Sequence, residues 1–391
     1  MDSNPQNFVD IMISSRRDAM HLAPVVHALR KIPFWDARIL VLQYDDEDLD
    51  SALSTLELTP NISWRLRGIH HQPSLFIGEI LIFLSDLWSR NSPSWVLIYG
   101  HSPFAFSCAF AAAEKQIPIA NIYDADHPHP KDRTDSQMRN TINTMCALHF
   151  IANAHIRNFL IKDGIDERKI YVVGSLLSES AGAIRKNWLT HSSAICSSES
   201  DAIPLCNSSS KFIYFSFAEP ERTEFFSSEF CSELNSKIPD LLWIVENSLG
   251  VGGLFEEKSG QRNVVFIDGA SHLQRCSILQ NALCVLSDSV ELLDECAAFG
   301  TPGILLRQST DRIDLISSGR ITMAEHFPQN LLRQIFNFAA ARKKSKNASA
   351  DESTAQAERM EASARVALAI TSQTNENVQK EKTSLLHPQA K

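Results

Sequence analysis

The sequence alternates between short apolar runs and longer segments in which apolar residues recur at helical spacing. Residues 96–102 (Val-Leu-Ile-Tyr-Gly-His-Ser) form one such run, and an Ala-rich helical segment joins it to the next run at 117–125 (Ile-Pro-Ile-Ala-Asn-Ile-Tyr-Asp-Ala). Adjacent parallel strands need a crossover of this kind, which is usually a helix. The alternation therefore predicts an α/β fold in which helices cover both faces of a parallel sheet.

The alternation stops once and then starts again, which predicts two domains. Residues 191–210 contain eight serines without periodicity, as in a linker or a long surface loop. Two such domains place a ligand between the carboxyl ends of their sheets, so we expect two Rossmann-like domains that face each other across a cleft. The expected divisions are an N-terminal Rossmann-like domain over 1–185, a Ser-rich linker over 186–211, a C-terminal Rossmann-like nucleotide-binding domain over 212–342, and a polar tail, partly helical or disordered, over 343–391.

Composition and charge argue against several classes of protein. The net charge of −9 is unfavourable for binding a nucleic-acid backbone, so we expect no nucleic-acid partner. The longest apolar stretch, residues 75–88, is interrupted by Glu79 and Asp86 and is too short to span a membrane. The polar start of the chain lacks the features of a signal peptide, and its eight cysteines include no C-x-x-C pair. We therefore expect a cytoplasmic protein with reduced cysteines, no metal ion and no cofactor.

Several blocks of sequence match, in order and spacing, the motifs of one enzyme family. Residues 13–24 (Ile-Ser-Ser-Arg-Arg-Asp-Ala-Met-His-Leu-Ala-Pro) resemble a G-T-R-P-E-x-I-K-x-x-P turn, and residues 286–295 resemble T-D-S-G-G-I-Q-E-E. Residues 307–312 (Arg-Gln-Ser-Thr-Asp-Arg) resemble R-x-x-T-E-R. Together these blocks are similar to those of the non-hydrolysing UDP-N-acetylglucosamine 2-epimerases. The resemblance implies a glycosyltransferase-B-type architecture and a UDP-sugar substrate. Members of this family often form dimers, so a homodimer is an expected assembly.

The same resemblance implies which residues hold the substrate. Arg16 falls on the family's Arg and His21 on its Lys, within the first motif. Arg139 falls on the Arg of an E-E-x-N-R motif, and a Ser-Gly helix start holds the phosphates in the family. The expected substrate-binding residues are Arg16, His21, Arg139, Ser289, Glu295, Arg307 and Thr310.

Catalysis in this family needs a base that removes the C2 proton of the sugar and a second group that returns it. Family carboxylates occupy the positions of His101, Tyr123 and Asp135, and a family histidine occupies that of Ala218. This chain keeps an acid only at Asp135, while His101 can exchange a proton near neutral pH. Asp124 offers an acid from the position next to Tyr123. The candidate catalytic residues are therefore Asp135, His101 and Asp124.

The substituted positions leave other interpretations open. Residues 123–129 (Tyr-Asp-Ala-Asp-His-Pro-His) fit an ordinary polar loop, but they also offer a shifted acid or ligands for a divalent cation. Val290 and Glu291 replace two family glycines, and both oppose the approach of a diphosphate. The predicted function is a nucleotide-sugar isomerase that converts UDP-GlcNAc to UDP-ManNAc by elimination and re-addition of UDP. The alternatives are an inactive relative that binds a sugar nucleotide or a protein partner, and a glycosyltransferase of the same architecture.

Overall fold

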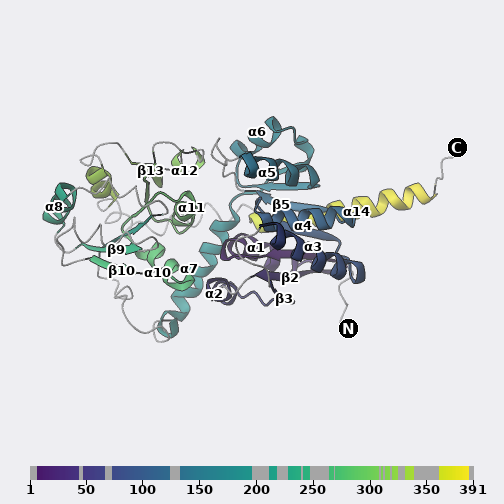
Figure 1. Ribbon diagram of the computed structural model, residues 1–391, viewed down its shortest axis with the longest axis horizontal. Coiled ribbons are helices and arrows are strands. Elements are labelled where there is room, and N and C mark those ends of the chain that lie inside the picture. Colours follow the sequence, from purple (N-terminus) through teal and green to yellow (C-terminus); the bar gives the residue numbers. More distant parts are fainter. Residues whose placement is uncertain are drawn as a thin grey trace. The chain divides into compact units, whose positions relative to one another are not determined.

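The chain forms two compact α/β units (Figure 1). Unit 1 comprises residues 1–180 and 360–391, and unit 2 comprises residues 181–359. Within these, the computed structural model describes residues 7–43, 47–66, 73–123, 133–195, 211–217, 228–238, 241–246, 264–267, 269–307, 310, 313–317, 319–324, 331–338 and 361–386.

Unit 1 is built on a seven-stranded parallel sheet of order β3-β2-β1-β4-β5-β6-β7. The chain winds outward from β1 to β3 and starts again at β4, on the other side of β1. The strand order therefore reverses between β1 and β4, as in a doubly wound fold. The strands are β1 (Asn7–Ile13), β2 (Trp35–Gln43), β3 (Ile62–Arg65), β4 (Trp95–Tyr99), β5 (Ile119–Tyr123), β6 (Leu148–Ile151) and β7 (Ile170–Val172).

Helices connect these strands in the order that the sequence pattern predicts. The five residues of β4 and the five of β5 are all buried, as expected of parallel strands that are covered on both faces. Between them α4 begins at the N-cap Ser102, whose hydroxyl accepts from the amide of Ala105 at 3.2 Å, and continues through an Ala-rich segment. The helices of unit 1 are α1 (Arg16–Leu29), α2 (Glu47–Thr55), α3 (Pro73–Arg90), α4 (Pro103–Glu114), α5 (Arg133–Met145), α6 (Ala154–Lys162), the 3-10 turn η1 (Glu167–Lys169), the first part of α7 (Leu176–Ile195), and α14 (Ala362–Leu386).

Unit 2 repeats the arrangement with a six-stranded parallel sheet of order β10-β9-β8-β11-β12-β13. Here the order reverses between β8 and β11. The strands are β8 (Phe212–Ser216), β9 (Leu242–Glu246), β10 (Val264–Ile267), β11 (Val285–Ser287), β12 (Gly303–Leu305) and β13 (Ile321–Met323), and the helices are α8 (Ser228–Lys237), α10 (His272–Asn281), α11 (Val290–Ala298) and α12 (Ile313–Ser317). The prediction of two α/β domains with parallel sheets is thus confirmed.

Two helices occupy parts of the stretches expected as linker and tail. α7 continues beyond residue 186, the expected start of the linker, and residues 196–210 lie outside the described part of the chain. α14 belongs to unit 1, where it packs against α1 (Figure 1). Glu179 accepts hydrogen bonds from the amides of Ala362 and Ser363, so a carboxylate caps the first turn of α14. The last helix therefore completes unit 1. In the described residues, no helix is both long and apolar enough to cross a membrane.

A buried ion pair anchors the centre of the unit 1 sheet. Asp10 on β1 is fully buried, and its two carboxylate oxygens each accept from the guanidinium of Arg38 on β2 at 2.7 Å. The indole of Trp88 donates to the same carboxylate at 2.7 Å, and the Arg38 guanidinium lies 4.4 Å from the ring of Phe8. Burial raises the pKa of Asp10 in spite of these donors. The carboxylate therefore depends on Arg38 for its compensation.

We expect Arg38→Gln to lower the free energy of unfolding by about 3–5 kcal/mol, because it leaves a buried carboxylate without its charge partner. Arg90→Gln is the matched control, since Arg90 forms an exposed pair with Asp86 and such pairs contribute less than about 1 kcal/mol. Urea unfolding followed by circular dichroism measures both. Equal effects of the two substitutions would show that the Asp10 pair does not anchor the sheet.

Candidate functional site

Ligands of doubly wound sheets bind at the carboxyl ends of the strands, where the strand order reverses. In unit 1 this point lies between β1 and β4. β1 leads into Ser14 and Ser15 at the start of α1, and β4 leads into a turn at Gly100 and His101. In unit 2 the same point lies between β8 and β11, which ends at Ser287. Each unit therefore has one candidate edge, the carboxyl ends of the strands beside its switch point.

The start of α1 is fixed by a capping box. The hydroxyl of Ser15 accepts from the amide of Asp18 at 3.2 Å, and the Asp18 carboxylate accepts from the amides of Ser14 and Ser15 at 2.8 and 3.0 Å. Burial raises the pKa of Asp18, although these hydrogen bonds oppose the rise. Asp18 thus closes the helix start, and this fixes Arg16 directly at the edge of the sheet.

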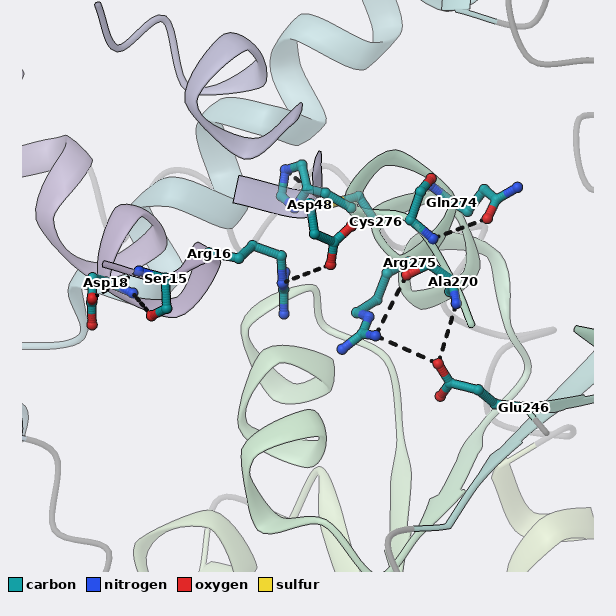
Figure 2. A network of polar contacts seen from close by, with 11 residues as sticks. Ser15, Arg16, Asp18, Asp48, Glu246, Ala270, Gln274, Arg275 and Cys276 are labelled. Atoms are coloured by element: carbon teal, nitrogen blue, oxygen red, sulfur yellow. Dashed lines mark hydrogen bonds and ion pairs between the residues drawn. The ribbon is translucent and has the colours of Figure 1, made fainter. Parts of the chain in front are cut away.

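Arg16 and His21 both lie on the buried side of α1. The Arg16 Nε lies 4.0 Å from a carboxylate oxygen of Asp48 on α2, as Figure 2 shows. His21 donates from Nδ1 to the carbonyl of Arg17 at 2.9 Å, and its ring stacks on Tyr99 with centroids 4.0 Å apart. Tyr99 is the last residue of β4. The structure therefore places both predicted binding residues beside the point where β1 and β4 separate.

His101 and Tyr123 approach each other at this edge. Gly100 has a φ of +69°, a conformation that favours glycine, and it turns the chain out of β4 immediately before His101. The side-chain amide of Asn121 on β5 donates to the Gly100 carbonyl at 3.1 Å and holds this turn. The rings of His101 and Tyr123 lie 6.2 Å apart, and Tyr123 is completely buried. Asp124, the shifted-acid candidate, lies outside the described residues, as does the rest of the polar segment up to His129.

α5 carries the other two residues predicted in unit 1. Asp135 lies in its first turn. Arg139 is buried one turn later, where its Nη2 lies 3.6 Å from a carboxylate oxygen of Asp163 and its guanidinium lies 5.2 Å from the ring of Phe159. Both contacts are with α6 and its C-cap. The contacts that the structure shows for Arg139 therefore hold α5 and α6 together, and its role in substrate binding stays a prediction.

In unit 2, Ser289 caps α11 directly after β11. Its hydroxyl accepts from the amide of Leu292 at 3.3 Å, and its own amide donates to the hydroxyl of Ser287 at 3.0 Å. Glu291 is exposed in the first turn of α11, whereas Glu295 is buried one turn later. The helix thus directs its positive end toward the switch point, but the exposed acid of Glu291 opposes an anion there.

Two further predicted binding residues follow the neighbouring strand β12. Arg307 comes two residues after β12, and its Nε is buried with no hydrogen-bond partner among the described residues. Thr310 is partly buried. The guanidinium of Arg307 is therefore a donor group at the same edge as the start of α11.

A polar network that no sequence motif predicted surrounds Glu246, at the carboxyl end of β9. Its Oε2 accepts from the hydroxyls of Tyr214 and Ser216 at 2.7 and 2.6 Å. Its Oε1 accepts from the amide of Ala270 at 3.2 Å and lies 3.5 Å from Nη2 of Arg275 (Figure 2). An acid that directly follows the apolar run at 241–245 was the available signal.

The strand register places this network beside the switch point of unit 2. Ser216 is the register partner of Glu246 on one side and of Ser287 on the other. Burial raises the pKa of Glu246, but the hydroxyl donors and the nearby guanidinium outweigh it and hold the pKa below its usual value. Glu246 is therefore a charged group at the edge of the central strands.

The comparisons with known proteins point to one family. A family model described as UDP-N-acetylglucosamine 2-epimerase matches residues 28–371. Over 328 residues the chain is 24% identical to the UDP-N-acetylglucosamine 2-epimerase of Salmonella typhimurium, covering 80% of this chain and 85% of that protein.

Solved structures show the same fold. A crystal structure of the UDP-GlcNAc 2-epimerase from Neisseria meningitidis, bound to UDP-GlcNAc, matches with a TM-score of 0.72 and 20% identity, covering 84% of this chain and 90% of that chain. The UDP-GlcNAc 2-epimerase from Methanocaldococcus jannaschii matches with a TM-score of 0.69 and 18% identity, covering 84% of this chain and 92% of that chain. These likenesses confirm the predicted fold class, two α/β domains of the glycosyltransferase-B type.

One buried histidine lies away from both edges. His149 is the second residue of β6 and is completely buried. Burial lowers its pKa to about 4. The folded protein therefore holds this imidazole neutral over a pH range in which the unfolded chain protonates it.

We expect His149 to make the protein less stable as the pH falls. Its contribution is fully present above the unfolded pKa near ~6.5 and is lost as the pH approaches 4, up to about 3 kcal/mol. Urea unfolding at several pH values in this window measures the slope of stability against pH. His149→Gln should flatten that slope, whereas His155→Gln, at an exposed position on α6, should leave it unchanged. Equal slopes in both variants would contradict the prediction.

Proposed function

This chain belongs to the family of UDP-N-acetylglucosamine 2-epimerases, and we propose that it binds UDP-GlcNAc and inverts the configuration at C2 of the sugar. The family match extends over residues 28–371, which include elements of both sheets. The relative from Neisseria meningitidis was crystallised with UDP-GlcNAc bound, which supports a UDP-sugar as ligand of this chain.

Three residues that the motifs singled out lie at the switch points of the two sheets, and this position supports the proposal most directly. Arg16, His101 and Ser289 each come within three residues of the end of a strand that borders a switch point, at β1, β4 and β11 respectively. This is the place where a doubly wound sheet binds nucleotides. The motif residues thus lie at the edges where a fold of this kind binds its ligands, which supports the proposal.

The proposed reaction has two halves. In the first, a base takes the C2 proton while the C1–O bond to UDP breaks, and UDP leaves with the bonding electrons to give 2-acetamidoglucal. In the second, a proton returns to C2 from the opposite face and a UDP oxygen adds to C1, which gives UDP-ManNAc. The two halves need two proton-transferring groups on opposite faces of the sugar. We assign these roles to His101 and Asp135, with Asp124 as the further candidate.

The departing UDP needs positive charge. We assign this role to Arg16 in unit 1, and to Arg307 and the start of α11 in unit 2. His21, which stacks on Tyr99, and Arg139, which lies over the ring of Phe159, are the further substrate-binding candidates in unit 1. Glu295 and Thr310 complete the predicted binding set in unit 2.

Proton exchange at C2 tests the proposed reaction directly. The protein is incubated with UDP-GlcNAc in deuterated water and followed by proton NMR, and we expect the C2 proton signal to disappear while the manno isomer accumulates. Asp135→Asn should slow the exchange at least about a hundredfold, because it removes a proton-transferring group. The control Asp166→Asn alters an exposed acid that pairs with Arg168, and it should leave the rate unchanged. Binding without any exchange would favour the inactive, sugar-nucleotide-binding alternative.

Glu291 gives a second test, at the phosphate end. Its carboxylate lies exposed in the first turn of α11, where negative charge competes with an anionic ligand. Glu291→Gln should therefore tighten UDP binding about two- to fivefold in isothermal titration calorimetry. Glu233→Gln, which removes an acid paired with Lys237 on α8, is the control of equal charge change. Unchanged affinity in both variants would place the diphosphate away from α11.

A further inference from the structure

Arg275 on α10 has more hydrogen-bond donors than the described residues accept. Its Nη2 lies 3.5 Å from Oε1 of Glu246 and 3.5 Å from the carbonyl of Ala270, and these are its only polar contacts among the described residues. Its Nε is buried with no hydrogen-bond partner in the part of the chain that the structure describes, and the side chain is 25% exposed. A guanidinium offers five N–H donors. A cation is therefore held at this edge with most of its donors unmatched.

The carboxylate beside it does not require this guanidinium. Glu246 already accepts from two hydroxyls and one backbone amide, at 2.6, 2.7 and 3.2 Å. The separation of 3.5 Å from Arg275 is long for a charge-assisted hydrogen bond, which is ordinarily ~2.7–2.9 Å. The network fixes Glu246, and Glu246 in turn restrains Arg275 without consuming its donors. This arrangement suits a guanidinium that binds a second anion.

The topology places Arg275 at the switch point of unit 2. α10 crosses from β10 to β11, and its first turns lie at the carboxyl edge beside the end of β9. α10 packs against α11, the helix that Ser289 caps. Arg307 reaches the same edge from β12, on the other side of β11. Arg275 and Arg307 thus reach the carboxyl edge on opposite sides of β11, the strand that leads into α11 and the exposed acid of Glu291.

We infer that Arg275 is a phosphate-binding residue for a nucleoside diphosphate, and that Glu246 is the residue that positions it. The inference rests on the proposed function, because it assigns an additional ligand contact within the same UDP-sugar site. It explains how the site binds a diphosphate although an acid stands in the first turn of α11. The guanidinium of Arg275 supplies positive charge that the start of α11 alone does not supply.

The test is isothermal titration calorimetry of the full chain with UDP and with uridine. We expect Arg275→Gln to weaken UDP binding at least about tenfold, the loss expected for a charge-assisted hydrogen bond, and to leave uridine binding unchanged. Arg275→Lys keeps the positive charge, so its affinity for UDP should lie between those of the unaltered protein and Arg275→Gln. Arg320→Gln is the matched control, because Arg320 precedes β13 at the opposite edge of the same sheet and donates to the carbonyl of Ala297 at 2.9 Å. It should bind UDP as the unaltered protein does.

The role of Glu246 is tested in a double-mutant cycle with UDP. Glu246→Gln should weaken UDP binding in the unaltered chain and should have little further effect once Arg275→Gln is present. A purely structural role would weaken binding equally in both backgrounds, and this result would overturn the positioning role. Thermal unfolding of each variant identifies any loss of affinity that comes from misfolding, and in that case Arg275→Lys decides the question.

The outcomes distinguish a failure of the proposed function from a failure of the role assigned to Arg275. If the unaltered protein binds neither UDP nor UDP-GlcNAc, the proposed function itself is wrong. If it binds UDP and Arg275→Gln binds equally well, the inference is wrong and the proposed function stands. If Arg275→Gln loses uridine and UDP to the same extent, the contact is with the nucleoside, and the assignment to phosphate is overturned.

Discussion

Parallel strand pairing is the constraint on which the rest of this structure depends. Successive parallel strands need a crossover, and the helical crossovers cover both faces of each sheet, so the strands are buried and apolar. Polar side chains therefore gather mainly at the strand ends, and Asp10 is tolerated inside the sheet because Arg38 pairs with it. Because all strands of a sheet run the same way, their carboxyl ends share one edge, and Arg16, His101, Glu246 and Ser289 come to the edges of their sheets for this reason.

Buried charge is the second feature that shapes both units. Asp10, Asp18 and Glu246 are each buried at or within a sheet, and each is surrounded by donors that compensate for lost solvation. The three carboxylates serve different ends. Asp10 joins neighbouring strands through Arg38, Asp18 closes a helix start, and Glu246 holds a guanidinium that keeps unmatched donors. The same kind of side chain thus has three different structural surroundings, and these surroundings decide what each carboxylate holds in place.

Much of the fold could be predicted from the sequence, and less of the site. The buried strands are continuous apolar runs, which is why β4 and β5 were recognisable as strands and their helix as a crossover. The motifs singled out Arg16 and Ser289, and the structure shows both within three residues of a strand end; their part in a site stays a prediction. The contact between Glu246 and Arg275 was not predicted. The two residues are 29 positions apart in the sequence, and only the crossover through α10 brings them together. The packing of α14 on unit 1 was likewise not visible, because its partners lie on α1 and α7.

Local periodicity and motifs in a fixed order were enough to predict the class of fold, the alternation of strands and helices, and the family to which the chain belongs. The contacts of the polar residues, in contrast, follow from the folded arrangement. It turned Asp18 into a capping residue, stacked His21 on Tyr99, and brought Tyr214, Ser216 and Arg275 around one carboxylate. The physical reason is that the state of a buried charge depends on which donors surround it, and those donors come from strands and helices that are distant in the sequence.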